Sequence, residues 1–489
     1  MRRQINRQGD SDVNAKVSRV AAVKNPYPVT TPTRIPSARY YDQTFYDLEC
    51  ERLWPRVWQM ACRLEEIPKP GDYVEYEILN ESIIVARVDD KTVKAYHNHC
   101  RHRGMKLVMD RGTARQGFSC PFHGWRFNLD GDCTFIYQKD LFPEADRDPA
   151  DLRLRPVRVD IWGGCAFINL DYKAPPVAEA LEPFSSYHEA RGASHMRTVW
   201  WKSTVVPVNW KLAMEAFMEG YHVMRTHPQI LPASVNRGPD AVYRPVGSKI
   251  TGSTTQAALQ TGSVDSAALI ENSIHFIRTL CEGMEGGMVM PKDIEIAESL
   301  RGAQLPPDPV EATREWNRLF NEALTKRYRA QGMPMHDLNE LEKTRGQSVQ
   351  FGFPNYFLLP MYGNMASYRI RPLGPESTLF EIWALTLYPE GQEPPSPKKP
   401  EPIPCSSQEW PPIPRQDFAN LPHQQRGLRT TGFDFMRVSN EVEGLISNFH
   451  RVIDGYIDGA DHRKLVPAMQ QVSGGIDSPI KDINLKASG

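Results

Sequence analysis

Two short pairs of cysteine and histidine restrict the fold and the chemistry of this 489-residue sequence more than any other feature. The first pair is Cys100 and His102, and the second is Cys120 and His123. One or two residues separate the thiol from the imidazole within each pair, so each pair comes from one tight loop. A glycine lies within two residues of each histidine and permits such a turn. The sequence therefore predicts two loops that supply four metal ligands.

Two thiolates and two imidazoles suit two kinds of metal site. In a Rieske centre, two thiolates hold one iron of a [2Fe-2S] cluster and two histidines hold the other iron. A tetrahedral zinc site can use the same ligands, but zinc fingers usually pair cysteine with cysteine and histidine with histidine along the chain. Each loop here carries one of each type. The pattern therefore favours the iron–sulfur cluster, with zinc as the main alternative.

The residues around the four ligands resemble those of a known enzyme family. Residues 98–104 (NHCRHRG) and 120–127 (CPFHGWRF) resemble the catalytic (alpha) subunit of the Rieske non-haem iron oxygenases, which hydroxylate aromatic rings. The resemblance covers most of residues 40–460. It implies that the two loops hold a Rieske [2Fe-2S] cluster.

A second candidate metal motif lies about 100 residues further along the chain. Residues 209–222 contain few helix breakers and predict one helix that ends near His227. Glu219 and His222 are three residues apart and share a face, whereas His222 and His227 lie about 140° apart on a regular helix. Because Pro228 disfavours the helical conformation at the preceding residue, we expect His227 to leave the helix and turn back.

These histidines resemble the iron motif of the same family. The run Glu219-x-x-His222-x(4)-His227 is similar to the family's Asp/Glu-x-x-His-x(4)-His motif, which implies that both histidines bind a mononuclear Fe(II). A distant carboxylate would complete the facial triad that leaves positions open for dioxygen. Residues 416–428 resemble the family's Asp-x(7)-Gln-x-Gly stretch and nominate Asp417, although an ordinary helix N-cap is the alternative role for this residue. The weaker candidates for the third ligand are Glu441, Glu443 and Asp454.

Glu219 has a different expected role. In the family, the acidic residue at this position bridges an iron-ligating histidine and a Rieske histidine of the neighbouring subunit, which implies a cyclic oligomer, most simply a homotrimer. A carboxylate beside a ligating histidine also fixes its tautomer. A solvated helix carboxylate is the alternative. Many ring dioxygenases have Asp here, whereas Glu occurs in some members, including ones that act on quaternary ammonium compounds.

The remaining sequence predicts an α+β fold. Clustered prolines predict a loose N-terminal arm over residues 1–40, followed by a helix over residues 41–54. Short alternating strands predict a small antiparallel β Rieske domain over residues 55–172. Residues 173–489 mix strands and helices, and the resemblance implies a larger catalytic domain of the helix-grip, START-like type. Residues 274–345 within it predict a helical insertion.

Composition disfavours several other classes of protein. The formal net charge is −1 and no long run of like charge occurs, so neither nucleic acid nor an anionic membrane is an expected partner. No apolar run reaches the ~18 residues of a spanning helix, and the first residues do not resemble a signal peptide. We therefore expect a cytoplasmic protein whose six cysteines outside the two loops are reduced.

A Rieske cluster and a facial-triad iron in one chain predict an oxygenase. The expected reaction is mono- or dihydroxylation of a hydrophobic, aromatic or other ring-containing substrate, as in aromatic hydrocarbon catabolism. Oxidative N- or O-demethylation, including that of quaternary ammonium compounds, is the alternative. The chain has no Gly-x-Gly-x-x-Gly and no plant-type ferredoxin motif, so electrons must come from a separate NAD(P)H-dependent reductase, with or without a ferredoxin.

Three further possibilities stay open at this stage. A beta subunit can accompany the catalytic chain. A Rieske electron carrier without its own chemistry would have no need of a second iron motif in some 300 further residues. A zinc-binding interaction module is the remaining class.

Overall fold

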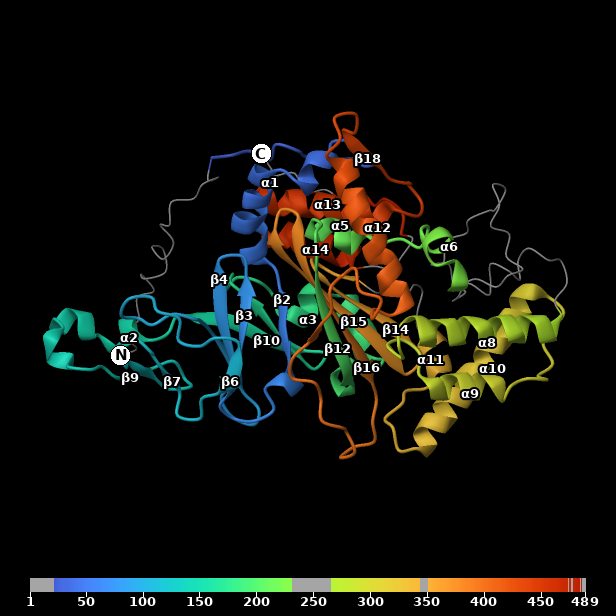
Figure 1. The fold of residues 1–489 in the computed structure, drawn as a ribbon, viewed down its shortest axis with the longest axis horizontal. Helices are drawn as coiled ribbons and strands as arrows, with labels where there is room; N and C mark the ends of the chain where they lie inside the picture. The colour runs from blue at the N-terminus through green and yellow to red at the C-terminus, as the bar shows by residue number, and fades with distance from the viewer. Residues whose placement is uncertain are drawn as a thin grey trace, which may run out of the picture.

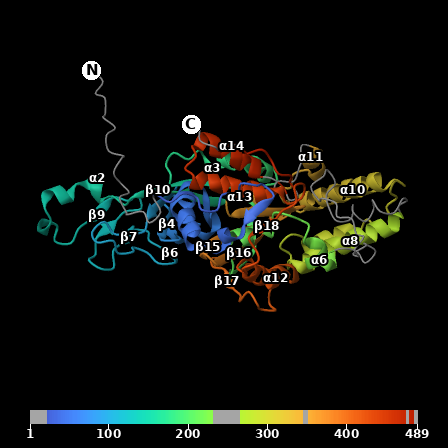
Figure 2. The ribbon, with the colours of Figure 1, turned by 90° about the horizontal axis from the view of Figure 1, so that it is seen from above.

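The structure, a computed structural model, describes residues 22–230, 265–343 and 351–473, together with residues 475, 478–483 and 485. Figure 1 shows an elongated molecule with the two cluster loops toward one end, a group of helices at the other and two large sheets between them. Figure 2 shows the same three parts in a row from above. No helix in the described part of the chain is long and apolar enough to cross a membrane.

The described part of the predicted N-terminal arm is packed rather than loose. Its strand β1 (Arg34–Pro36) pairs antiparallel with β18 (Phe435–Arg437), and Ile35 and Tyr40 are fully buried. The helix predicted over residues 41–54 is divided into three segments, which follow a 3-10 turn. The four segments are η1 (Ser37–Tyr40), α1 (Gln43–Leu48), the π-helical η2 (Glu49–Leu53) and η3 (Trp54–Arg56).

The first large sheet is antiparallel and supports the cluster loops. Its order is β2 (Gln59–Arg63), β11 (Cys165–Asn169), β10 (Pro156–Trp162), β5 (Val93–His97), β4 (Glu81–Arg87), β3 (Asp72–Ile78) and β6 (Arg111–Thr113). A small sheet adds β7 (Phe118–Ser119), β8 (Arg126–Phe127) and β9 (Cys133–Phe135). Strand β3 alternates buried and more exposed residues, which is the period-2 pattern that predicted it.

The second large sheet forms the centre of the catalytic region. Its order is β13 (Phe351–Gly352), β14 (Tyr356–Met361), β15 (Asn364–Gly374), β16 (Ser377–Thr386), β12 (Arg197–Val206) and β17 (Glu401–Pro402). Neighbours are antiparallel except β17, which pairs parallel with β12. The predicted α+β fold, with a mainly antiparallel β part followed by a larger part of strands and helices, is confirmed by this architecture.

Helices lie along one side of the catalytic sheet (Figure 1). They are α5 (Trp210–Glu215), α12 (Pro412–Leu428), α13 (Gly444–Ile457) and α14 (His462–Val472). Helix α12 begins at Pro412, because proline is tolerated in the first turn of a helix.

The helical segment predicted over residues 274–345 begins earlier. It comprises α8 (Ser266–Gly283), α9 (Pro291–Glu298), α10 (Pro309–Ala330) and α11 (Leu338–Lys343). Helix α10 buries Trp316, Phe320, Leu324 and Tyr328, which recur every fourth residue on one face. The shorter connecting helices are α2 (Pro149–Leu152), α3 (Val177–Ala180), α4 (Phe184–Glu189), η4 (Leu64–Glu66), η5 (Lys139–Leu141), η6 (Glu144–Arg147) and η7 (Ala193–His195).

A buried arginine joins the two large sheets. Arg369 on β15 makes a bidentate ion pair with Glu381 on β16, at 2.7 and 2.8 Å. Its Nη1 also donates to the backbone oxygen of Met60 on β2 at 3.0 Å. The same Nη1 donates to the Ala61 oxygen at 2.5 Å, so the buried pair depends on β2 for two backbone acceptors.

Candidate metal centres

The two Cys/His loops have the same backbone geometry. The backbone N–H of Gly104 donates to the Cys100 oxygen, and that of Gly124 donates to the Cys120 oxygen, both at 3.0 Å. Both glycines have positive φ, 75° and 72°, where a side chain would be strained. The loops follow β5 and β7 and place both thiols inside, with Cys100 and Cys120 at 2% and 3% exposure.

The histidines of the two loops lie side by side. The rings of His102 and His123 have centroids 4.7 Å apart, and the buried Trp125 stacks on His102 at 4.9 Å. The Nδ1 atom of His102 is buried and has no hydrogen-bond partner among the described residues. Burial, followed by the charges of His123 and Arg103, lowers the pKa of His102 and keeps the ring neutral. A neutral imidazole with an unpartnered buried nitrogen fits a metal ligand.

The two thiols of the loops are also placed as metal ligands would be. Both cysteines are free. Burial, together with the adjacent Cys120 thiol, raises the pKa of Cys100 to about 11. A bound metal cation would supply the positive charge that holds two such thiols as thiolates.

The helix predicted over residues 209–222 is wrong in its length. Helix α5 ends at Glu215, and a separate helix α6 (Val223–Thr226) follows, with η8 (Pro228–Ile230) after it. The Glu219 carboxylate accepts from the backbone N–H of His222 at 2.9 Å, so a side chain satisfies a group that a continuous helix would have paired. His227 leaves the helical region at φ −120° and ψ 55°, as the following proline predicts.

His222, His227 and Asp417 come together into one candidate metal site. One ligand atom from each lies within 4.8 Å of the other two. His227 Nε2 is 3.0 Å from Asp417 Oδ1, and His222 Nε2 is 4.0 Å from the same oxygen. His227 and Asp417 are buried, whereas the His222 side chain is 25% exposed. Two imidazoles and one carboxylate form the ligand set of a facial triad.

The alternatives for the third ligand lie elsewhere. Asp417 is inside α12, whose N-cap is Pro411, so the N-cap role considered for it is wrong. Asp454 pairs with the buried Arg39 at 2.6 Å. Glu443 lines a cavity described below, and neither it nor Glu441 belongs to the group of three that the described residues form.

In each histidine of this site, Nε2 faces Asp417 and Nδ1 has a separate side-chain partner. His222 Nδ1 lies 2.7 Å from Glu219 Oε1, and His227 Nδ1 lies 2.8 Å from Gln416 Oε1. Burial lowers the pKa of His222, but its hydrogen bond to Glu219 and the charges of Glu219 and Asp417 outweigh burial, so the net shift is upward. Both Nε2 atoms therefore face the same carboxylate oxygen. Gln416 could not be predicted from the sequence, because its partner His227 is 189 positions away.

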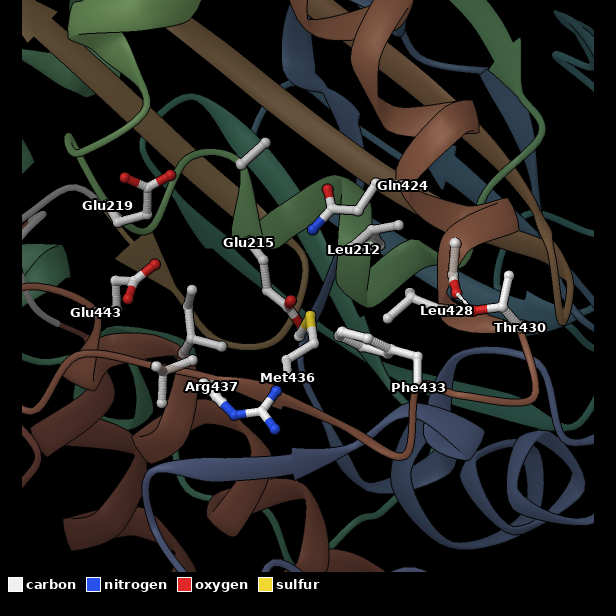
Figure 3. Close-up of a pocket in the computed structure, with 14 residues that line it drawn as sticks. Leu212, Glu215, Glu219, Gln424, Leu428, Thr430, Phe433, Met436, Arg437 and Glu443 are labelled. Atoms are coloured by element: carbon white, nitrogen blue, oxygen red, sulfur yellow. Dashed lines mark hydrogen bonds between the residues drawn. The ribbon is translucent and has the colours of Figure 1, made fainter.

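A cavity of about 660 Å³ lies beside Glu219 (Figure 3). Three carboxylates line it, those of Glu215, Glu219 and Glu443, together with Arg437. Leucine, phenylalanine and methionine side chains of α5, α12 and the following segment complete the wall. The cavity wall therefore combines three carboxyl groups and one guanidinium with apolar side chains.

Glu215 is a buried titratable group that sequence reasoning missed. It accepts from the Tyr40 hydroxyl at 2.8 Å and lies 2.7 Å from His450 Nε2. Burial raises the pKa of Glu215 to about 8, against the lowering effects of the Tyr40 hydrogen bond and the charges of Lys211 and Arg39. A buried carboxylate is uncommon and therefore informative, but its burial cannot be read from the sequence.

Comparison with known families identifies the chain. The family of Rieske [2Fe-2S] domains matches residues 57–143, and the family of ring hydroxylating alpha subunits (catalytic domain) matches residues 193–459, more than half of the sequence. The protein belongs to the Rieske-type ring-hydroxylating alpha subunits. Its cofactors are accordingly a Rieske [2Fe-2S] cluster and a mononuclear iron, and the zinc alternative for the two loops is excluded.

Individual relatives differ in their named reactions. The chain is 33% identical over 202 residues to the carnitine monooxygenase oxygenase subunit of Escherichia coli (strain K12), covering 40% of this chain and 52% of that protein. It is 28% identical over 198 residues to the biphenyl dioxygenase subunit alpha of Paraburkholderia xenovorans (strain LB400), covering 38% and 43%. The chain thus spans about half the length of the curated relatives it matches.

Solved structures show the same fold over a longer stretch. A quaternary ammonium Rieske monooxygenase in its apo form has a TM-score of 0.56 at 18% identity, covering 88% of this chain and 99% of that chain. Naphthalene 1,2-dioxygenase from Rhodococcus sp., bound to indole, has a TM-score of 0.57 at 19% identity, covering 90% and 96%.

Proposed function

We propose that this protein is the terminal oxygenase component of a Rieske non-haem iron system, which uses dioxygen and external electrons to hydroxylate a hydrophobic substrate. The observation that carries the proposal is the convergence of His222, His227 and Asp417 in a chain that also has a Rieske domain. When bound, the cluster supplies single electrons and the iron supplies a position for dioxygen.

The chain's own residues then have separate tasks. The ligands of the cluster are Cys100, His102, Cys120 and His123, and those of the iron are His222, His227 and Asp417. Glu219 accepts the hydrogen bond of His222 Nδ1, which leaves Nε2 free of a proton and able to bind metal. Trp125 covers the ring of His102 and excludes water from one side of it.

Aromatic side chains next to the iron site favour a ring-containing substrate. Phe418 follows Asp417 on α12, and its ring lies 5.1 Å from that of Phe380. Phe217, five residues before His222, lies 5.7 Å from the same Phe380 ring. These packed aromatic rings beside Asp417 favour an apolar or aromatic substrate over a polar one.

A second candidate reaction is oxidation of a quaternary ammonium substrate with cleavage of a carbon–nitrogen bond. Two observations favour it. Glu219 stands where many ring dioxygenases have Asp, and relatives include a carnitine and a glycine betaine monooxygenase oxygenase subunit. Aromatic faces also attract quaternary ammonium cations, so the same aromatic rings are compatible with either substrate.

A head-to-tail contact between copies of the chain is part of the proposal. Phe122 beside the cluster is 59% exposed, and the Arg103 guanidinium lies 5.6 Å from its ring centroid. This basic and apolar tip complements the Glu219 carboxylate and the apolar side chains of the cavity beside it. A closed ring of copies, most simply a homotrimer with or without a beta subunit, would place one chain's cluster beside the next chain's iron.

The electrons come from a separate NAD(P)H-dependent reductase, with or without a ferredoxin, and the complex works in the cytoplasm. The test is to incubate the iron-loaded protein with a compatible reductase and NADH. One set of reactions receives aromatic compounds and the other receives carnitine or glycine betaine, and hydroxylated products and released amines are identified by mass spectrometry. Products from the first set support ring hydroxylation, and amines from the second support the alternative. Asp417→Ala is the matched inactive control, and dioxygen consumption without any product from either set contradicts both substrates.

The oligomer has its own test. Chains with His222→Ala lack a working iron site, and chains with Cys100→Ala lack a working cluster, so each variant alone should be inactive. Reassembled mixtures of the two should recover part of the activity, because one chain's cluster can serve its neighbour's iron. Mixed oligomers with no activity would show that electrons stay within one chain.

A further inference from the structure

Two consecutive side chains of α12 face the two nitrogens of the His227 ring. Nε2 lies 3.0 Å from Asp417 Oδ1, and Nδ1 lies 2.8 Å from the amide oxygen of Gln416. His227 is 3% exposed, so bulk water cannot take the place of either partner. The orientation of this ring is therefore set by α12 rather than by the short helix α6 that precedes it.

The proton of the neutral ring belongs on Nδ1. A ring nitrogen that carries a proton has no lone pair for a metal, so Nε2 must be free of it in a metal site. The Nδ1–H group then needs an acceptor, because a buried donor without a partner is costly. Gln416 Oε1 is that acceptor.

Gln229 in turn fixes the direction of the Gln416 amide. Gln229 Nε2 donates to Gln416 Oε1 at 2.8 Å, and Gln416 Nε2 donates back to Gln229 Oε1 at 3.2 Å. With the proton on His227 Nδ1, rotating the Gln416 amide by 180° would place its NH₂ group against that N–H. Both hydrogen bonds of the amide pair and the one from Nδ1–H are then satisfied only when the Gln416 oxygen faces His227 and the Gln229 NH₂ group faces that oxygen.

We propose that Gln416 is a positioning residue of the iron site, which fixes the tautomer and the direction of the His227 ring and is itself fixed by Gln229. The inference rests on the proposed function, because it requires His227 to bind the iron. It also makes the two histidines unequal, since a carboxylate holds His222 and a neutral amide holds His227. A hydrogen-bonded partner of this kind typically changes metal affinity by about 10- to 100-fold when it is lost.

The test compares three variants of the full chain with its cluster in place. Gln416→Leu removes the acceptor, Gln416→Glu keeps an acceptor at the same reach, and Gln471→Leu alters an exposed glutamine of α14 as the control. Affinity for Co(II) is measured by competition with a coloured chelator. We expect Gln416→Leu to bind Co(II) about 10- to 100-fold more weakly, Gln416→Glu to bind at least as tightly as the wild type, and the control to be unchanged.

A spectroscopic readout separates positioning from general damage. The EPR spectrum of the nitric oxide adduct of the ferrous protein reports the symmetry of the iron site, and Gln416→Leu should change it while the melting temperature of the metal-free protein stays the same. Wild-type affinity and spectrum in Gln416→Leu would overturn the proposal, as would a Gln416→Glu variant as weak as Gln416→Leu.

His227→Ala distinguishes failure of this inference from failure of the proposed function. If His227→Ala retains the metal, His227 is not a ligand and the proposed iron site itself is wrong. If His227→Ala loses the metal while Gln416→Leu behaves as the wild type, only the positioning role is lost. Gln229→Leu adds an internal check, because its effect should disappear in a chain that already carries Gln416→Leu.

Discussion

The cluster loops and the iron site both use histidines, yet the fold assembles them in different ways. The proposed cluster ligands come from two similar loops within residues 100–123, each closed by a hydrogen bond from a glycine N–H to a cysteine oxygen. The proposed iron ligands come from a short irregular segment and from the middle of α12, far along the chain. The first site depends on local turns, and the second depends on the packing of distant elements.

This difference has a practical consequence. A substitution in one site should leave the other filled, because no residue serves both within a chain. Damage to the packing of α12 should empty the iron site before it disturbs the loops.

The largest expected effect is the complete and separate loss of each metal. Asp417→Ala should remove the mononuclear iron and all turnover while the Rieske absorption and EPR spectra stay intact, because a facial triad needs its carboxylate. Cys100→Ala should do the reverse, with loss of the cluster and retention of the chelatable iron. Metal analysis and EPR of the two purified variants check both outcomes. Loss of both metals in either variant would contradict the independence of the sites.

The next largest effect is a change in the reduction potential of the Rieske cluster. His123→Cys replaces a neutral ligand with a thiolate, and the added negative charge should lower the reduction potential by on the order of a few hundred millivolts. A chromophore should remain, and redox titration followed by EPR measures the shift. An unchanged potential would show that His123 does not ligate the cluster.

A stability experiment tests the link between the two regions. Arg369→Ala removes the bidentate ion pair with Glu381 and leaves this buried carboxylate with the 3.3 Å ion pair to Arg371. It also removes the hydrogen bonds from Arg369 to the backbone of β2. We expect the free energy of unfolding to fall by about 3–5 kcal/mol in urea titrations.

Arg318→Ala is the control for that experiment, because Arg318 forms an exposed pair with Glu315 on α10. Its loss should change stability by about 0.5 kcal/mol or less. Equal effects of the two substitutions would mean that the buried pair does not join the sheets.

The smallest expected effect depends on pH. Because its pKa is raised to about 8, Glu215 keeps its proton in the folded chain between about pH 4.5 and 8, where the unfolded chain has lost it. The folded state then binds more protons, so its stability falls as the pH rises through this window. Glu215→Gln cannot ionise and should gain stability relative to the wild type as the pH is raised from 5 to 8.5. Urea titrations at both pH values check this, and a constant difference would contradict the raised pKa.

Sequence reasoning was most successful where the physical cause is local. The short strands predicted over residues 55–172 are present as an antiparallel sheet, and β3 shows the alternation of buried and more exposed residues most clearly. Pro228 predicted the departure of His227 from the helix, which depends on adjacent residues only. The paired loops were recognisable because all of their ligands lie in one short stretch.

The errors and omissions occur where distant contacts decide the structure. The end of α5 at Glu215 was missed because a side chain, Glu219, competes with the helix for a backbone N–H. The arm was expected to be loose, but β1 pairs with β18 near the other end of the chain. Gln416 could not be predicted, since its role depends on a contact with His227 that only the folded structure shows.

The central claim is that one chain holds a cluster and a separate three-ligand iron. The most direct test is to treat the fully loaded wild-type protein with a ferrous chelator and to follow iron content and the EPR spectrum of the reduced cluster together. We expect the chelator to remove one iron per chain and to stop turnover, while two irons per chain remain and the EPR spectrum of the cluster is unchanged. Loss of the cluster signal in step with the chelated iron, or no chelatable iron in an active protein, would contradict it.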